Sequence, residues 1–213
     1  MKKYYPIFLD LENRHCVVIG GGVIAERKVR ALLSAGAFVR LISPTCTKSI
    51  SCLHAKGRIE LLSRRYAEGD LKGASLVFAA TGSDAVNSKV REEALRLGIP
   101  LNVADNPQLC DFIVPSIVKR DPILIAISTS GVLPMLSKKL RQEIGEKLPA
   151  DYVKYARLVG AFRKFLLENV TDNRRRREIM KRLGQEPVPE VAGMTLKEIK
   201  ERFLPDKNRR AVE

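Results

Sequence analysis

Short apolar runs alternate with helix-like segments along the first half of the chain. Residues 15–19 and 38–42 are apolar and contain β-branched side chains, so each run predicts a strand. Between them, residues 25–33 place apolar side chains at helical spacing, and Gly36 provides a stop. A strand, a glycine turn, a helix and a strand in succession predict a βαβ unit with a right-handed crossover.

The same alternation continues toward the middle of the chain. Residues 84–97 predict a helix that ends at Gly98. We expect further strands at 59–62, 76–80, 100–104 and 123–128. Strands that alternate with helices predict an α/β fold with a doubly wound, Rossmann-type parallel sheet, whose ligand lies beyond the carboxyl ends of the strands.

The strand pattern stops near residue 135. Residues 136–148 predict an amphipathic helix, and 150–213 predict two or three more helices. Pro187-Val188-Pro189 marks a break between helices, and Thr195 has the character of an N-cap. We expect the chain beyond Pro205 to be frayed.

A glycine-rich loop joins the first predicted strand to the first predicted helix. Gly20 permits the tight turn, and the missing side chain of Gly22 lets the backbone approach a pyrophosphate at the positive end of the helix dipole. Ala25 stands where a third glycine is common and still allows close helix packing. Because this GxGxxA pattern lies within a βαβ unit, it predicts a dinucleotide site.

The residues after the second strand do not decide between NAD and NADP. An Asp or Glu that would bind the ribose hydroxyls is missing there, and Ser43 is the side chain that could hydrogen-bond a hydroxyl. Ser43 supplies no charge against a 2′-phosphate, but Arg40 is close enough in sequence to complicate the choice. On the residues alone, both cofactors remain open.

Two more strand ends carry candidate chemistry. Thr81 follows small residues where a cofactor could pass close to the backbone, although a simple turn explains them equally well. Asp105 follows the strand at 100–104 and could act as a general acid or base. Asp105-Asn106-Pro107 is also a good turn signal, so both interpretations stand.

A hydroxyl-rich turn follows the strand at 123–128. Ser128, Thr129 and Ser130 precede a glycine and could bind a carboxylate or a phosphate. An ordinary helix N-cap would explain the same run. No nucleophile with a histidine partner is visible, which disfavours a hydrolase.

Charge and composition narrow the class of partner. The formal net charge is +14, and part of it lies in Arg174–Arg177 and Lys181-Arg182. Nucleic acid, an anionic membrane surface, a polyanionic substrate and a solvated basic surface all compete as explanations. No aromatic residues accompany the arginines, which disfavours single-stranded nucleic acid.

The remaining composition points to a cytoplasmic protein without a metal site. The longest apolar runs are far too short to span a bilayer, and no signal-peptide core follows Met1. The four cysteines form no CxxC pair, and the two histidines have no metal-ligand spacing with them. We expect Cys16 to be a buried apolar side chain.

Six short motifs follow one another along the first 131 residues: PIFLDL (6–11), GGGVIAERK (20–28), AAT (79–81), NVAD (102–105), FIVPS (112–116) and ISTSG (127–131). Together they resemble the precorrin-2 dehydrogenase family, the NAD-dependent enzymes that form sirohydrochlorin in siroheme synthesis. Some members also act as ferrochelatases. The resemblance covers about the first 150 residues, and the helical tail is similar only in general character.

The resemblance implies three parts and a homodimer. These parts would be an NAD-binding Rossmann domain at 1–114, a dimerisation segment at 115–149 and a small helical domain at 150–213. The methyltransferase domain that is fused to some siroheme synthases is absent, so a separate enzyme would supply precorrin-2.

The resemblance also assigns roles to residues. Val23 and Ile24 would contact NAD at the start of the helix, and Pro44 and Thr45 would contact it after the second strand. Asp105 falls on the position of the family's catalytic aspartate. A serine that is phosphorylated in some members aligns with Thr129, a departure that puts such regulation in doubt.

The positive charge acquires a specific explanation from the same resemblance. Precorrin-2 bears many carboxylates, and a basic cleft would concentrate it. Lys138, Lys139 and Arg141, just after the hydroxyl-rich turn, are the residues that we expect to face it. NAD would accept a hydride while Asp105 takes up or relays a proton.

Three functions remain to be distinguished at this point. The first is NAD-dependent oxidation of precorrin-2, with or without ferrochelation. The second is a regulatory module that senses NAD without turning it over. The third, a basic nucleic-acid-binding protein, is the least favoured, because no recognition motif accompanies the arginine cluster.

Overall fold

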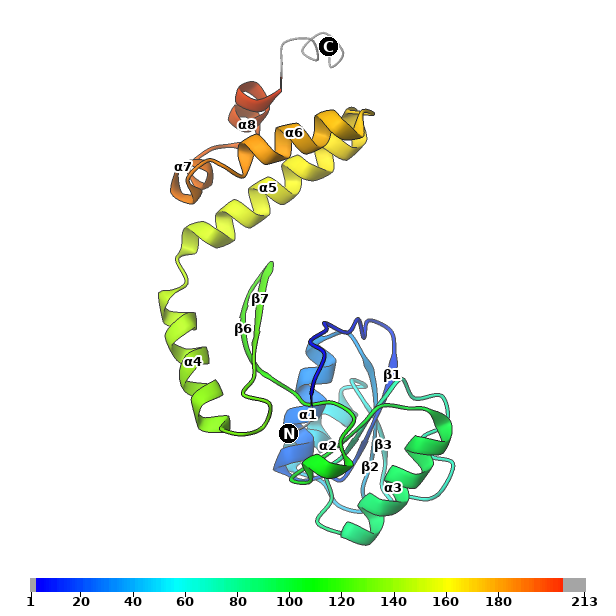
Figure 1. Cartoon of the computed structure of the whole chain (residues 1–213). Coiled ribbons are helices and arrows are strands. Elements are labelled where there is room, and N and C mark those ends of the chain that lie inside the picture. Colours follow the sequence, from blue (N-terminus) through cyan, green and yellow to red (C-terminus); the bar gives the residue numbers. More distant parts are fainter. Residues whose placement is uncertain (1–2, 205–213) are drawn as a thin grey trace. The chain divides into compact units, whose positions relative to one another are not determined.

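The computed structural model describes residues 3–204. The chain divides into two compact units, Met1–Val114 and Pro115–Glu213, which are described separately. Figure 1 shows the first unit as a sheet with helices around it, and the second as a hairpin followed by helices.

The first unit is built on a parallel sheet. Its strand order is β3-β2-β1-β4-β5, and every neighbouring pair is parallel. The order reverses between β1 and β4, which is the point where doubly wound sheets bind their ligands. The strands are β1 (His15–Ile19), β2 (Phe38–Ile42), β3 (Glu60–Leu62), β4 (Leu76–Ala79) and β5 (Leu101–Val103).

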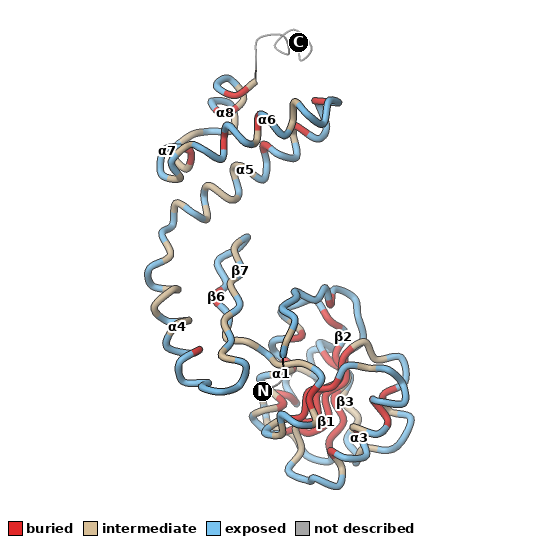
Figure 2. The backbone as a smooth tube through the Cα atoms, in the orientation of Figure 1, coloured by how far each residue is buried: buried red, intermediate tan, exposed pale blue. Residues whose placement is uncertain are grey.

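Helices cover both faces of this sheet, as the sequence pattern predicts. Helix α1 (Val23–Ser34) and helix α2 (Lys48–Ala55) pack on one face, and α3 (Asp84–Leu97) packs on the other. The buried residues form a band along the strands in Figure 2, because both faces of a parallel sheet are covered. Cys16 is fully buried there, as expected.

Helix α2 was not predicted from the sequence. Its eight residues mix small, polar and apolar side chains, and Ile50 is the one that is buried. The helix begins because the Thr47 side chain accepts a hydrogen bond from the backbone N–H of Ile50. A short helix with one buried side chain gives too weak a periodic signal to detect.

The second unit begins with a separate antiparallel hairpin. Strands β6 (Ser116–Arg120) and β7 (Ile123–Ile127) pair with each other, so the prediction that 123–128 continues the doubly wound sheet is wrong. Two residues join the strands, which suits an antiparallel pair, whereas a parallel pair needs a long crossover. Helix α4 (Pro134–Lys147) follows and packs on β6.

Four helices complete the described part of the second unit: α5 (Ala150–Asn169), α6 (Asn173–Leu183), α7 (Val188–Ala192) and α8 (Leu196–Phe203). The two or three helices expected here are therefore too few, because the proline-flanked segment forms a helical turn of its own. Thr195 is the N-cap of α8 in a complete capping box, as expected.

The four helices share one apolar core. Phe162 and Leu166 of α5 are buried against Ile179 and Leu183 of α6. No helix within residues 3–204 combines the length and the apolar character that crossing a membrane requires. The expectation of a frayed end beyond Pro205 concerns residues outside the described range.

Candidate functional site

The glycine loop lies between the ends of two parallel strands. Gly20 has φ +110°, a conformation that favours glycine, and its backbone N–H donates to the Ile42 carbonyl at 2.9 Å. A Cβ at Gly20 would stand 2.3 Å from the carbonyl oxygen of Ala80. The tight turn expected at Gly20 therefore also depends on close contact with the end of β4.

The next two glycines serve different purposes. A Cβ at Gly21 would stand 2.0 Å from the Thr45 carbonyl oxygen, so Gly21 is required by packing within the protein. Around Gly22 there is nothing within 4 Å of such a Cβ. Gly22 is the N-cap of α1, and no side chain caps this helix.

The start of α1 therefore fits the pyrophosphate of a dinucleotide. The first backbone N–H groups of a helix have no intrahelical partner and bind anions readily. Val23, at the first helical position, is exposed, and Ile24 is half-buried. Ala25 is fully buried against the sheet. The open space at Gly22 leaves room for a phosphate group to approach these N–H groups.

The loop after β2 is fastened to the glycine loop. The backbone N–H of Thr47 donates to the Gly21 carbonyl at 3.0 Å, and the Thr47 hydroxyl donates to Glu26 at 2.8 Å. The hydroxyl groups of Thr47 and Ser49, together with Arg30, hold the pKa of Glu26 below its usual range. The loop is thus held in place by α1 itself.

Ser43, Pro44 and Thr45 take different positions in this loop. Ser43 is buried, and its hydroxyl donates to the Thr45 carbonyl at 2.6 Å. Pro44 and Thr45 are exposed. Ser43 therefore shapes the loop, while its two neighbours present their side chains to solvent.

Thr81 follows β4 beside Gly20. Its hydroxyl lies 2.7 Å from the Asn87 side-chain oxygen, and the Asn87 amide donates back to the Thr81 carbonyl at 3.2 Å. Asn87 is buried on α3, whose N-cap is Ser83. These bonds fix the turn that brings the backbone of Thr81 next to the glycine loop.

Asp105 occupies a strained position just beyond β5. Its φ is +60°, which is uncommon for a residue with a side chain and is tolerated best by Asn and Asp. The side chain is exposed. Because the left-handed conformation costs about 1–2 kcal/mol for an L-residue, the surrounding turn must hold Asp105 there.

Cys110 is the residue that stabilises this turn. Its Sγ accepts from the Val103 backbone N–H at 3.2 Å, and it lies 3.3 Å from the Asn106 carbonyl. The buried Asn102 amide donates to the Phe112 carbonyl at 3.0 Å. Both ends of the turn around Asp105 are therefore tied to buried groups.

Lys28 of α1 lies on the same side as Asp105. Its Nζ is 5.1 Å from the centroid of the Phe78 ring. Burial lowers the pKa of the Lys28 ammonium and Arg27 adds to this, while Cys110 and Asp105 oppose the shift. A cation is thus available near the Asp105 carboxylate, a role that the sequence pattern did not reveal.

These groups line one edge of the sheet. The strand order places the ends of β2, β1, β4 and β5 in a row, so Pro44, Gly20, Thr81 and Asp105 follow one another along that row. With neighbouring strands about 4.8 Å apart, Asp105 lies roughly 10 Å from the glycine loop. This separation suits a dinucleotide that extends along the edge.

The hydroxyl-rich turn belongs to the second unit. The Ser128 hydroxyl accepts from the Ser130 backbone N–H at 3.0 Å, and the Thr129 hydroxyl accepts from that of Leu133 at 3.1 Å. Buried Ser137 of α4 lies 3.2 Å from the Thr129 hydroxyl. Helix α4 begins only at Pro134, so the serines are not its N-cap.

Lys138 and Arg141 are three residues apart on α4, which puts them on neighbouring positions of one helix face. Neither forms an ion pair with another residue of the described range, whereas Lys139 lies 3.9 Å from Glu143. The structure therefore brings together Ser128, Thr129 and Ser130 in one turn, with two uncompensated cations on the helix that follows.

The sequence analysis assigned no contact to three residues of the first unit: Gly21, Lys28 and Cys110. Gly21 and Cys110 act through contacts with residues distant in sequence, which no local pattern reveals. Lys28 follows buried Ala25 by three positions on α1, and that spacing is the one available signal that it faces inward.

Fold and loop together define a Rossmann-type dinucleotide-binding protein. The family model described as "Putative NAD(P)-binding" matches residues 7–116. The chain belongs to this family, and its cofactor is a nicotinamide dinucleotide.

Curated relatives share this sequence over most of the chain. The siroheme synthase of Nitrosospira multiformis is 41% identical over 192 residues, which are 88% of this chain and 41% of the relative. That of Methylococcus capsulatus is 39% identical over 201 residues, 94% of this chain and 42% of the relative. The chain thus spans about two fifths of the length of these relatives, and they confirm the resemblance found in the motifs.

A solved structure supports the fold over nearly the whole chain. The structure of SirC, precorrin-2 dehydrogenase, has a TM-score of 0.77 and covers 94% of this chain and 98% of its own. The two sequences are 24% identical. This likeness confirms the predicted order of a Rossmann-type sheet followed by a helical region.

Proposed function

We propose that this chain catalyses the NAD-dependent oxidation of precorrin-2 to sirohydrochlorin, with Asp105 as its catalytic residue. One observation carries the proposal: the exposed Asp105 carboxylate lies at the same sheet edge as the uncapped start of α1. The names of the siroheme synthase relatives and of the SirC structure support the substrate.

The chemistry requires the loss of a hydride and a proton from the macrocycle. Bound NAD supplies the hydride acceptor. The Asp105 carboxylate accepts the proton, and the exposed position lets it pass the proton to water. The left-handed backbone at Asp105 holds the carboxylate outward, beyond the end of β5. The Asp105 carboxylate opposes the lowering of the Lys28 pKa by burial, so a cationic side chain lies within electrostatic range of Asp105.

We assign NAD rather than NADP as the cofactor. Residues 43–47, which follow β2 and would approach the adenosine ribose, contain no Lys or Arg that could bind a 2′-phosphate. Arg40 is paired with Glu60 at 2.7 Å. The exposed Pro44 and Thr45 would contact the adenosine half, and Ser43 would keep them in place.

The substrate's carboxylates would bind to the second unit. Ser128, Thr129 and Ser130 supply hydroxyl groups in a turn with fixed backbone, and Lys138 and Arg141 supply positive charge. Charge-assisted hydrogen bonds of this kind are among the stronger polar contacts in proteins. The net charge of +14 would attract the polyanion from a distance.

We further propose that the chain acts as a cytoplasmic homodimer through residues 115–149, between an NAD-binding domain at 1–114 and a helical domain at 150–213. The hairpin packs on α4, yet it exposes Ile117 and Leu124 while α4 exposes Met135 and Leu136. A second copy would cover these side chains.

The test is turnover by the full chain under anaerobic conditions. Precorrin-2 is mixed with NAD or NADP, and reduced nicotinamide and sirohydrochlorin are followed by absorbance. Product formation is measured with each cofactor, and we expect a higher kcat/KM for NAD than for NADP. Folded protein that binds NAD but forms no NADH would refute the proposal and favour an NAD sensor. Ferrous iron added to sirohydrochlorin measures chelation separately.

A further inference from the structure

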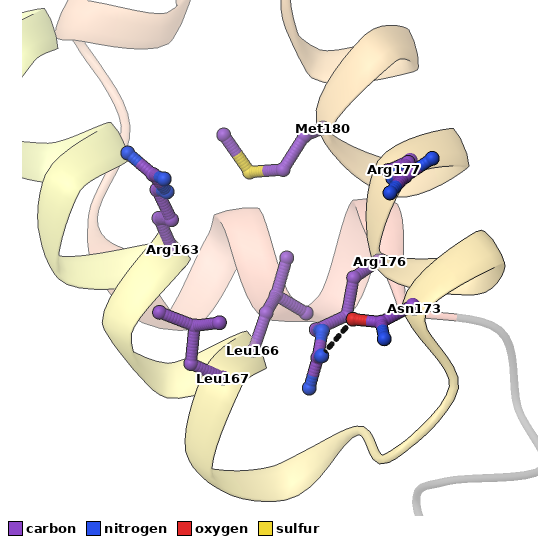
Figure 3. Close-up of a pocket in the computed structure, with 7 residues that line it drawn as sticks. All are labelled: Arg163, Leu166, Leu167, Asn173, Arg176, Arg177 and Met180. Atoms are coloured by element: carbon purple, nitrogen blue, oxygen red, sulfur yellow. Dashed lines mark hydrogen bonds between the residues drawn. The ribbon is translucent and has the colours of Figure 1, made fainter.

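The helices of the second unit contain a groove that the proposed reaction does not use. It lies between α5 and α6, has a volume of about 420 Å³, and is formed entirely by residues of these two helices. Figure 3 shows two leucines and a methionine in it, with three arginines around them. The arginine cluster noted in the sequence contributes Arg176 and Arg177 to this groove.

The apolar surface of the groove is an extension of the helical core. Leu166 is buried among the α5–α8 side chains, while Leu167 is 57% exposed and Met180 is partly exposed. At this end the Asp172 carboxylate caps α6 by accepting from the Arg174 backbone N–H at 2.8 Å, and Arg176 of α6 donates to the carbonyl of Val170, the C-cap of α5. The groove is therefore a fixed feature of a packed helix pair.

The charge around the groove is entirely positive. Arg176 donates to the Val170 carbonyl at 2.7 Å and to Asn173, so its guanidinium is held in place. Arg163 and Arg177 make no hydrogen bond or ion pair with any residue in the range 3–204. No carboxylate lines the groove, and Glu178 of α6 pairs with Arg174 at 3.2 Å.

This combination suits a ligand with an apolar body and carboxylates at its edge. Guanidinium groups bind carboxylates with two parallel hydrogen bonds, and leucine and methionine side chains cover flat apolar surface. Nucleic acid is a poorer fit, because no aromatic side chain lines the groove to stack on a base. The volume falls within the usual range for small-molecule sites, near its lower end.

We infer that this groove binds one edge of a polycarboxylate tetrapyrrole, the chemical class to which substrate and product of the proposed reaction belong. The identity of the ligand rests on the proposed function. The groove holds part of the macrocycle, with pyrrole rings against Leu167 and Met180 and peripheral carboxylates on the arginines. The groove would make the basic helices α5 and α6 a docking surface for tetrapyrroles.

The experiment uses uroporphyrin, a stable octacarboxylate porphyrin, titrated into the full chain and followed by fluorescence. The double variant Arg163→Gln with Arg177→Gln keeps the apolar stems and removes two charges. Its matched control, Lys164→Gln with Arg175→Gln, removes the same charge from the same two helices outside the groove. We expect the groove variant to raise the Kd about tenfold or more relative to the control.

A second variant tests the apolar floor. Leu167→Asp places a carboxylate in the groove at an exposed position, where the fold tolerates a polar side chain. We expect it to weaken uroporphyrin binding at least as much as the double variant. Circular dichroism and thermal unfolding establish that each variant remains folded.

Several results would overturn the inference. One is a parent chain that does not bind uroporphyrin, and another is an equal Kd for the groove variant and its matched control. In a third such result, the groove variants bind uroporphyrin like the parent chain but no longer bind phosphatidylglycerol vesicles or single-stranded RNA. That result would assign the groove to a different anion.

Failure here is distinguishable from failure of the proposed function. If the parent chain oxidises precorrin-2 with NAD but the groove variants bind uroporphyrin like the control, only the groove assignment is wrong. If the parent forms no NADH but the groove variants alone lose uroporphyrin binding, the groove stands and the proposed reaction is wrong.

Discussion

The first unit and the segment 115–149 bury their apolar side chains to very different extents. In the first unit, clusters on both faces of the sheet bury the strands and helices. Within 115–149 only Val118 and Ser137 are buried, and neither belongs to any of the three hydrophobic clusters. Figure 2 shows this contrast between the sheet and the hairpin β6–β7.

The difference separates two ways of building a site. The sheet edge at which we propose that the cofactor binds is formed within the first unit, where backbone hydrogen bonds such as Thr47 to Gly21 hold its loops. The segment 115–149 carries ordered polar groups on an apolar surface that has no cover among the described residues of its own unit. Chemistry at the sheet edge and assembly through 115–149 should therefore respond to separate substitutions.

The largest effect is expected at Asp105. Asn adopts the left-handed backbone as readily as Asp, so Asp105→Asn removes the charge without new strain. We expect kcat to fall about 10²–10⁴-fold, with NAD affinity and thermal unfolding unchanged. Steady-state kinetics and NAD titration measure the two quantities. Full activity in Asp105→Asn would remove this residue from the mechanism.

The next effect concerns the exposed surface of α4. Met135 is 77% exposed and would be covered in the proposed dimer. We expect Met135→Asp to raise the dimer Kd by about 100-fold, the cost of placing an unpaired charge in an interface. Leu95 on α3 of the first unit is 68% exposed, and Leu95→Asp is the matched control that should leave the dimer intact. Sedimentation analysis measures the dimer Kd of the parent and both variants. A parent chain that is monomeric would contradict assembly through 115–149.

A smaller effect is expected from the glycine loop. Gly21→Ala forces its Cβ against the Thr45 carbonyl and should destabilise the first unit by about 1–3 kcal/mol. Gly22→Ala meets open space, so its stability should match that of the parent while its affinity for NAD falls. Urea unfolding and NAD titration of both variants measure this. Equal stability of the two variants would show that Gly21 is not held against the loop after β2.

The smallest effect concerns acid stability. Arg64 binds Asp70 through two hydrogen bonds of 2.6 and 2.8 Å and lowers the pKa of that carboxyl below its usual 3.8. Because the folded pKa is lowered, the stabilisation is complete above pH 3.8 and is lost as the pH falls through the folded value.

Urea midpoints measured between pH 2.5 and pH 6 test this pair. Asp70→Asn should lower the midpoint at pH 6 and flatten its fall in acid. The exposed Lys139–Glu143 pair of α4 is 3.9 Å long, so Glu143→Gln should change little. A larger change of the urea midpoint in Glu143→Gln than in Asp70→Asn would contradict this prediction.

The sequence pattern predicts the first unit better than the second for a physical reason. A buried parallel strand is a continuous apolar run, and α1 repeats buried residues Ala25, Val29 and Leu32 at helical spacing. In the hairpin, β7 alternates partly buried and exposed residues, whereas β6 has Val118 as its one buried residue, and local pattern does not say which sheet a strand joins. The strand at 116–120 was missed because only Ile117 and Val118 in it are apolar, which is too short a run to predict a strand.

The candidate site shows the same limit. Gly20, Thr81 and Asp105 follow strands that could be recognised, so the parallel topology alone predicts that they share an edge. That Ser43 is buried, that Gly21 touches Thr45, and that Cys110 holds the turn at Asp105 all depend on contacts between distant segments. Such contacts follow from packing, which residue spacing does not encode.

The central claim is that one active site couples oxidation of precorrin-2 to reduction of NAD. The most direct measurement is the stoichiometry of the anaerobic reaction, with limiting precorrin-2 and excess NAD and with the full chain as catalyst. We predict one NADH for each sirohydrochlorin formed, and no sirohydrochlorin above the uncatalysed background when NAD is left out. Sirohydrochlorin formed at the same rate without NAD, or precorrin-2 left unchanged beside NAD-bound protein, would contradict the claim.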